Sequence, residues 1–283
     1  MATHNESPAA PSDTRFVRTQ FGRIAYTDSD PDAELTGAPL VFVHGNSASR
    51  AVFRAQLDDD FGPRRLLALD LLGHGESDNA TDPEQAYTHR GYAATIVEVL
   101  TALGIKRAVV VGWSLGGYIG LELIPRFPGL AGLIMTGTPP VGKDTLGDGF
   151  LPTADLRYAG VEDITLAEAA DYADQVTTPP APEGVLSDIL RTDGRARRVM
   201  FASVWAGHDL DKRALVATSS VPLAIIDGRE DPFVNRTYVD SLTYAALWRS
   251  TPVVMDGCRH APFLDNPAQY NELIREFLHD NKL

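Results

Sequence analysis

The chain has 283 residues, a formal net charge of −13 and one cysteine, Cys258. An acidic chain is a poor partner for nucleic acid or an anionic membrane surface, because both bind clustered lysine and arginine. A single cysteine excludes an internal disulfide framework and is typical of a reducing compartment, so we expect a cytoplasmic protein. Residues 1–15 are polar and lack a long apolar run, which predicts a disordered tail without a secretion signal.

Strand and helix patterns alternate along most of the chain. Apolar runs between turn residues predict a strand pair within 16–27 and strands at 40–43, 66–69, 108–111, 130–136, 223–226 and 252–255. Apolar residues at helical spacing predict helices at 50–57, 88–103, 115–126, 236–247 and 267–279. This alternation is typical of an α/β fold with a mostly parallel sheet covered by helices on both faces.

One stretch, 140–219, breaks the alternation. It is helical and loop-like without a convincing strand, and Thr165 with Glu168 forms a capping box at the start of one of its helices. We therefore predict a core domain made of 16–139 and 220–283, with 140–219 as a helical lid over the carboxyl edge of the sheet. The basic cluster in this stretch is predicted to be a solvated or ion-paired helix face; it consists of Arg191, Arg195, Arg197 and Arg198.

The segment 109–117 is the most informative part of the chain. A β-branched apolar run enters a Gly-x-Ser-x-Gly turn centred on Ser114 and continues into a helical pattern. Such a strand-turn-helix exposes the serine hydroxyl at the edge of a sheet. We predict that Ser114 is a catalytic nucleophile.

A serine nucleophile needs a base to take its proton and an acid to orient that base. Asp231 follows the strand at 223–226, and His260 follows the last strand, so both are expected at the edge that carries Ser114. The order serine, acid, histidine is that of α/β hydrolases and differs from other triad folds. Glu230 is the alternative acid, but the spacing from Gly228 favours Asp231.

The transition state of acyl transfer carries an oxyanion, which needs hydrogen-bond donors already in place. We predict that the donors are the backbone N–H groups of Leu115, directly after the nucleophile, and of Asn46, in the loop after the strand at 40–43. His44 and His74 lie in loops near the predicted site, and we favour a structural role for both.

These motifs together resemble the α/β-hydrolase superfamily, and within it the metal-independent N-acyl-homoserine lactone lactonases. The general resemblance lies in HGN, DLLGHGESD, GWSLGG, GREDP and RHAPF. The specific resemblance lies in HGNSAS, GWSLGGYIG, TGTPPV, RTDGRARRVMF and the segment 228–234. It implies a serine hydrolase that opens the lactone ring of bacterial signals through an acyl-enzyme, with no metal and no cofactor. The implied partner is a small lactone or ester with an acyl chain.

The resemblance also implies residues that bind the substrate. Tyr172 matches a tyrosine whose hydroxyl contacts the lactone, although packing on the core is an equal alternative. Trp113 is a further candidate for contact with the substrate. The apolar residues of the predicted lid are candidates for the acyl-chain pocket, with packing inside the lid as the commoner alternative: Phe150, Phe201, Val204 and Trp205. Cys258 and Arg259 depart from the small residue and glycine that usually precede the histidine; we interpret Cys258 as a packed side chain. Arg259 either disfavours a charged imidazole or points to solvent.

Two other functions remain open at this point. A carboxylesterase or a hydrolase of carbon–carbon bonds would share the triad and differ only in the lid. A non-catalytic ligand receptor would keep the cavity without turnover, but the intact triad disfavours it. A metal-dependent lactonase would need a dense histidine and aspartate cluster, whereas the seven histidines are scattered. The sequence predicts no particular oligomeric state.

Overall fold

The computed structural model describes residues 14–30 and 36–283. The described residues form an eight-stranded sheet with the order β1-β2-β4-β3-β5-β6-β7-β8. Strands β3 to β8 are parallel to one another, whereas β2 pairs antiparallel with both β1 and β4. The strands are β1 (Arg15–Thr19), β2 (Gly22–Asp28), β3 (Leu40–Val43), β4 (Leu66–Leu69), β5 (Ala108–Trp113), β6 (Leu130–Thr136), β7 (Leu223–Gly228) and β8 (Val253–Met255). The predicted mostly parallel sheet is confirmed.

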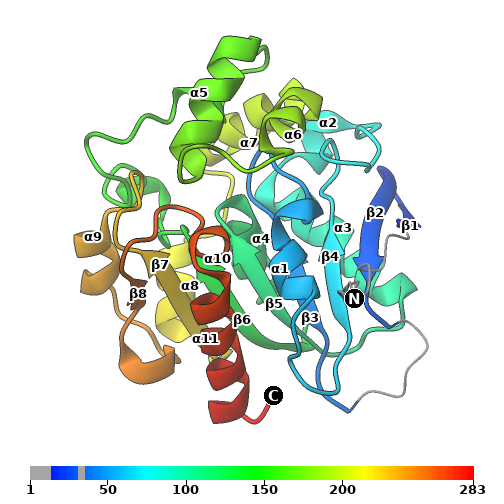
Figure 1. The fold of residues 1–283 in the computed structure, drawn as a ribbon, viewed down its shortest axis with the longest axis vertical. Coiled ribbons are helices and arrows are strands. Elements are labelled where there is room, and N and C mark those ends of the chain that lie inside the picture. Colours follow the sequence, from blue (N-terminus) through cyan, green and yellow to red (C-terminus); the bar gives the residue numbers. More distant parts are fainter. Residues whose placement is uncertain (1–13, 31–35) are drawn as a thin grey trace, which may run out of the picture.

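The central strands are apolar on both sides because helices cover both faces of the sheet. Successive side chains of a strand point to opposite faces, and Val41 and Val43 accordingly pack in one core cluster while Leu40 and Phe42 pack in the other. Figure 1 shows helices on both sides of the sheet, with α1 and α11 in front of it in that view. The helices of the first face are α3 (His89–Ala102), α4 (Leu115–Leu123), α8 (Lys212–Thr218) and α9 (Arg236–Ser241); those of the second are α1 (Arg54–Leu57), α10 (Pro262–Asp265) and α11 (Pro267–Asp280).

Residues 140–219 lie between β6 and β7 in the chain and are helical, as predicted. The helices are α5 (Leu166–Val176), α6 (Val185–Arg191), α7 (Gly194–Ala206) and α8, with short 3-10 turns η2 (Lys143–Thr145) and η3 (Arg157–Ala159). The capping box forms, since Thr165 and Glu168 each accept a hydrogen bond from the other's backbone N–H. Helices α5, α6 and α7 gather beyond one end of the sheet (Figure 1). We call 140–219 the insertion; its action as a lid stays a prediction.

Several predicted boundaries are wrong, and the helix expected over 115–126 ends at Leu123. The helix expected over 236–247 ends at Ser241, because Leu242 is extended and Leu247 pairs with Leu223 of β7. The predicted tail of 1–15 also extends too far, since Arg15 begins β1; residues 1–13 lie outside the described residues. The remaining short elements are η1 (Arg50–Phe53), α2 (Pro83–Ala86) and η4 (Trp248–Ser250).

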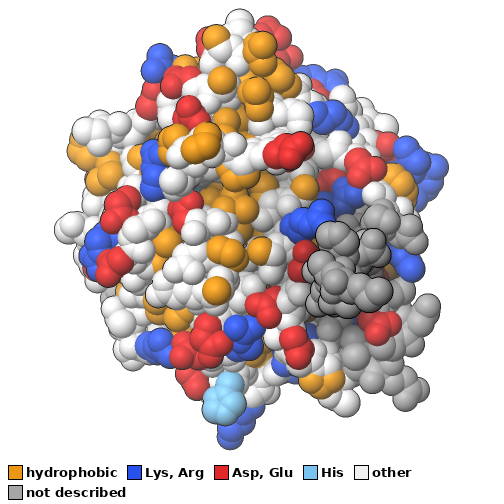
Figure 2. Space-filling model, viewed as in Figure 1, with side chains coloured by type: hydrophobic (Ala, Val, Ile, Leu, Met, Phe, Trp, Pro, Cys, Tyr) orange, Lys and Arg blue, Asp and Glu red, His pale blue; other side chains and the backbone are white. Residues whose placement is uncertain are grey.

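The surface mixes both signs of charge despite the negative net charge. Figure 2 shows lysine, arginine and acidic side chains interspersed around the lower part of one face, and hydrophobic side chains gathered in the upper part, over α5 and below it. Large hydrophobic side chains that are exposed include Leu166, Leu190 and Trp205 of the insertion. Within 14–30 and 36–283, no helix has the length and apolar character needed to cross a membrane.

Candidate active site

Ser114 occupies a strained turn between β5 and α4. Its backbone has φ 52° and ψ −112°, a conformation that is unfavourable for a residue with a side chain. Close packing around the turn maintains this conformation. For example, a Cβ atom added to Gly116 would lie 2.0 Å from the carbonyl oxygen of Val43. The N–H of Ser114 donates to the carbonyl of Thr136 at 2.7 Å, which fixes the turn against β6.

His260 and Asp231 meet at the same edge of the sheet, each from the loop after a parallel strand. Nδ1 of His260 lies 2.7 Å from Oδ2 of Asp231, while Oδ1 of Asp231 accepts hydrogen bonds from the backbone N–H groups of Phe233 and Val234. Burial alone would raise the pKa of Asp231, but the interaction with His260 and these backbone hydrogen bonds outweigh it and lower the pKa. The alternative acid, Glu230, is exposed.

The imidazole of His260 is fixed on several sides. The indole N–H of Trp113 donates to the backbone carbonyl of His260 at 2.9 Å, and the ring of Phe233 meets the imidazole edge-on at 4.9 Å. Gly137 covers another side so closely that an added Cβ would lie 2.5 Å from Cε1 of the imidazole. Trp113, predicted to bind substrate, therefore also positions the histidine.

The two predicted oxyanion donors lie beside Ser114. Leu115 is the first residue of α4, where helix geometry provides no intrahelical acceptor for its N–H. The hydrogen bonds of the described residues leave the backbone N–H of Asn46 without an acceptor as well. His44 holds the Asn46 loop, since its Nδ1 contacts the carbonyl of Gly45 at 2.7 Å and its Nε2 accepts from the N–H of Leu71 at 3.0 Å. Buried His74 lies next to it, with a ring separation of 5.1 Å.

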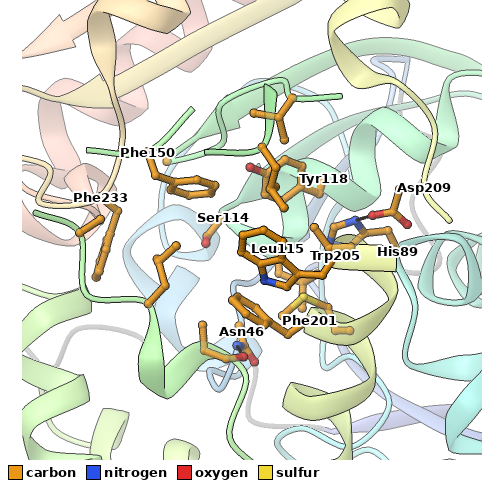
Figure 3. Close-up of a pocket in the computed structure, with 18 of the residues that line it drawn as sticks. Asn46, His89, Ser114, Leu115, Tyr118, Phe150, Phe201, Trp205, Asp209 and Phe233 are labelled. Carbon is orange, nitrogen blue, oxygen red and sulfur yellow. Dashed lines mark hydrogen bonds and ion pairs between the residues drawn. The ribbon is translucent and has the colours of Figure 1, made fainter. Parts of the chain in front are cut away.

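These residues surround a cavity of about 300 Å³, shown in Figure 3. Residues of the core and of the insertion form its walls. Of the predicted site residues, Asp231 alone does not line the cavity, because it lies behind His260. The predicted residues that line it are Asn46, Trp113, Ser114, Leu115, Phe150, Tyr172, Phe201, Val204, Trp205 and His260. Burial raises the pKa of the Tyr172 hydroxyl to about 12, so it remains a neutral donor. Trp205 is 58% exposed.

Comparison with known proteins agrees with this geometry. Residues 40–273 match the sequence profile of the alpha/beta hydrolase family. This protein is an α/β hydrolase. A solved structure of the N-acyl homoserine lactonase AidH with N-butanoyl homoserine is 40% identical over 95% of this chain and 97% of that chain, with a TM-score of 0.90. An AidH variant in complex with N-hexanoyl homoserine lactone gives a TM-score of 0.89 and covers 98% of that chain.

Curated relatives are more distant from this α/β hydrolase. An uncharacterised protein of Mycobacterium tuberculosis is 28% identical, over 86% of this chain and 76% of its own length. A pimeloyl-[acyl-carrier protein] methyl ester esterase of Neisseria meningitidis is 26% identical, over 84% of this chain and 92% of its own length.

The prediction of a solvated or ion-paired helix face is wrong for Arg197. Its side chain is buried and donates to the carbonyls of Val161, Glu162 and Ile189 and to Oγ of Ser47. It therefore ties the insertion to the loop that carries Asn46. Helical spacing indicates the burial, because Arg197 lies three residues before buried Met200, on the apolar side of α7.

Asp227, at the end of β7, is a buried carboxyl that the sequence analysis missed. It accepts the backbone N–H of Gly137 at 2.7 Å and so supports the residue that covers the ring of His260. Burial and then the nearby carboxylate of Asp231 raise the pKa of Asp227 to about 7. The sequence contains a signal for this burial, because Asp227 directly follows four apolar residues of β7.

The alternative that Arg259 points to solvent is wrong, whereas its effect on a charged imidazole stays a prediction. Its guanidinium donates to the carbonyls of Asp174 and Thr177, at 3.1 and 3.2 Å. These carbonyls lie at the C-terminal end of α5, where a cation is favourable, and α5 carries Tyr172. Arg259 thus joins the His260 loop to the insertion. Cys258 is buried, as expected of a packed side chain.

We expect Arg197→Met to lower the free energy of unfolding by about 2 kcal/mol, because it leaves several buried carbonyls without donors. Arg198→Met is the matched control: Arg198 is the next residue on α7, pairs with exposed Glu84 and Glu162, and should change stability by no more than about 0.5 kcal/mol. Urea unfolding measures both values. Equal effects of the two substitutions would contradict the assigned role of Arg197.

Asp227→Asn should change how stability depends on pH. In the folded protein the pKa of Asp227 lies above that of an unfolded chain, about 3.9, so the native state binds more protons between roughly pH 4 and pH 7. The stability of the wild type therefore falls as the pH rises through this window. The amide retains an acceptor for Gly137 and does not titrate, so the Tm of the variant relative to wild type should rise from pH 5 to pH 8. Parallel Tm curves would argue against a buried titrating carboxyl.

Arg259→Ala should loosen the C-terminal end of α5, because two hydrogen bonds from a charged donor are lost. We expect faster amide hydrogen exchange near the end of 166–176 and a loss of about 1 kcal/mol in unfolding free energy. Arg229→Ala removes a nearby arginine that pairs with exposed Asp256 and serves as the control. The connection to α5 would be refuted by unchanged exchange in that helix.

Proposed function

We propose that this protein is a serine hydrolase that opens the lactone ring of N-acyl homoserine lactones. The observation that carries the proposal is the 40% identity to a lactonase, over 95% of this chain, together with the cavity around Ser114. At the coarser level, the chain is an α/β hydrolase acting on ester or lactone bonds. The finer choice of substrate is supported by the complexes of AidH with N-butanoyl homoserine and N-hexanoyl homoserine lactone.

In the proposed reaction, Nε2 of His260 takes the proton of Ser114 as Oγ attacks the lactone carbonyl carbon. Asp231 holds the Nδ1 proton of the imidazole and stabilises its positive charge. The N–H groups of Asn46 and Leu115 stabilise the oxyanion. The bond between the carbonyl carbon and the ring oxygen then breaks, and the ring oxygen takes the proton from His260 and remains tethered as a hydroxyl.

The resulting acyl-enzyme is an ester of Ser114. His260 accepts a proton from water, whose oxygen attacks the same carbonyl, and the serine leaves with that proton as the acyl-homoserine is released. We assign the neutral hydroxyl of Tyr172 to contact with the lactone, since Tyr172 lines the cavity from α5. Phe150, Phe201, Val204 and Trp205 are assigned to the acyl chain, and residues of the insertion would close over it as a lid.

Ser114→Ala is expected to lower lactone opening at least about a thousand-fold, since it removes the nucleophile. Ser187→Ala is the control, because Ser187 lies on the exposed side of α6 and its hydroxyl bonds only within that helix turn. Mass spectrometry identifies the reaction: ring opening adds one water, whereas amide cleavage releases homoserine lactone. Hydrolysis of p-nitrophenyl esters with no opening of micromolar lactone would instead indicate a carboxylesterase.

A further inference from the structure

A second pair of histidine and aspartate lines the same cavity. His89 begins α3 and Asp209 precedes α8, and Nδ1 of His89 lies 2.6 Å from Oδ2 of Asp209. Figure 3 shows the pair next to Tyr118 and Trp205, on the other side of Ser114 from Phe233 in that view. The proposed reaction uses neither residue.

The protonation of His89 follows from its surroundings. Burial and then the ammonium group of Lys212 lower the pKa of His89, so the imidazole is neutral at pH 7. Burial alone would raise the pKa of Asp209, but its contacts with His89 and Lys212 outweigh the burial and lower the pKa to about 2. A carboxylate at 2.6 Å repels a lone pair and attracts a proton, so the one ring proton of His89 belongs on Nδ1.

The other ring nitrogen, Nε2, is then an acceptor without a donor. Within 14–30 and 36–283, both ring nitrogens of His89 are buried and neither makes a hydrogen bond of good geometry. Nδ1 has the close contact with the carboxylate of Asp209, whereas Nε2 has no partner among the described residues. The neighbouring groups are already engaged: the hydroxyl of Tyr118 donates to the carbonyl of Pro139, and Lys212 lies 3.3 Å from Glu122 and 3.4 Å from Asp209. A buried acceptor left unpaired costs free energy, which indicates that a ligand supplies the donor.

The pair of His89 and Asp209 lies where we expect the acyl chain of the substrate rather than its lactone ring. Tyr118 lies one helical turn after Ser114 on α4, and the ring of His89 stacks on that of Tyr118 at 5.0 Å. The side chains of Phe201 and Trp205 lie on the same side of the cavity (Figure 3). An acyl chain bound along these aromatic side chains would pass the imidazole of His89.

We propose that His89 and Asp209 form a subsite for a hydroxyl group on the acyl chain, whose O–H donates to Nε2 of His89. This proposal rests on the proposed function for the identity of the substrate. A keto group presents only lone pairs and would face the lone pair of Nε2, so the subsite discriminates against it. The expected order of reactivity at the matching carbon is hydroxyl, then unsubstituted, then keto.

The test is a series of octanoyl homoserine lactones that carry a hydroxyl or a keto group at each chain carbon from the third onward. In wild type, kcat/KM should rise roughly five-fold for a hydroxyl at one or more positions, the worth of about one neutral hydrogen bond. His89→Phe keeps the ring and removes the acceptor, so the gain should disappear. His208→Phe, on a neighbouring exposed histidine, should retain it.

A second variant keeps the test decisive if His89→Phe does not fold. Asp209→Asn removes the carboxylate that holds the proton on Nδ1, so Nε2 can carry the proton and donate to a keto oxygen. The ratio of hydroxyl to keto reactivity should therefore fall. A flat series in wild type, or a hydroxyl gain that persists in His89→Phe, overturns the proposal.

The same experiment separates this proposal from the proposed function. If the unsubstituted lactone is opened but the series is flat, the lactonase function stands and the subsite fails. If no lactone is opened, the series is repeated with p-nitrophenyl esters of the same acyl chains. A hydroxyl gain there that depends on His89 supports the subsite after the lactonase function has failed.

Discussion

The active-site geometry depends on the close contact between Gly116 and the carbonyl oxygen of Val43. No residue with a Cβ fits there, and the contact brings the first turn of α4 against the carboxyl end of β3. That approach places the N–H of Leu115 near the loop of Asn46, so one contact sets the nucleophile and both proposed oxyanion donors. The strain at Ser114 is a consequence, because the chain must reverse within one residue to reach this position.

Residues next to the nucleophile and next to the histidine hold the other parts of the site in place. Trp113, directly before the nucleophile, holds the backbone of His260 through its indole N–H. Arg259, directly before His260, holds the end of α5, and Arg197 holds the loop of Asn46 from α7. The insertion is thus fastened to the core at the two loops on which the proposed chemistry depends. We therefore expect the stability of the insertion and the geometry of the site to be coupled through these two arginines.

The sequence predicts those parts of the site that depend on local patterns of strands and turns. Ser114, Asp231 and His260 each follow a strand, and parallel strands bring their carboxyl ends to one edge, so a chain order was enough to place them. The helix expected over 236–247 ends at Ser241, because pairing of Leu247 with Leu223 of a separate element competes with helix formation in the second half of this range. Arg197 was misjudged from charge alone, although its position on the apolar side of α7 was visible. The pairing of His89 with Asp209 had no sequence signal, since it depends on how the insertion packs against α3 and α4.

The pairs His260–Asp231 and His89–Asp209 are chemically similar, but their surroundings suit them to different roles. In both, a carboxylate oxygen lies close to Nδ1, at 2.7 Å for His260 and 2.6 Å for His89, which favours the proton on Nδ1 and leaves Nε2 as an acceptor. The carboxylate of Asp231 is held by backbone N–H groups, which carry no net charge, so its full charge is available to stabilise a protonated His260. The carboxylate of Asp209 is shared with the ammonium group of Lys212, which opposes a second positive charge on His89. The first arrangement suits a base that must gain a proton during the reaction, whereas the second suits a neutral acceptor that binds a hydroxyl and stays neutral.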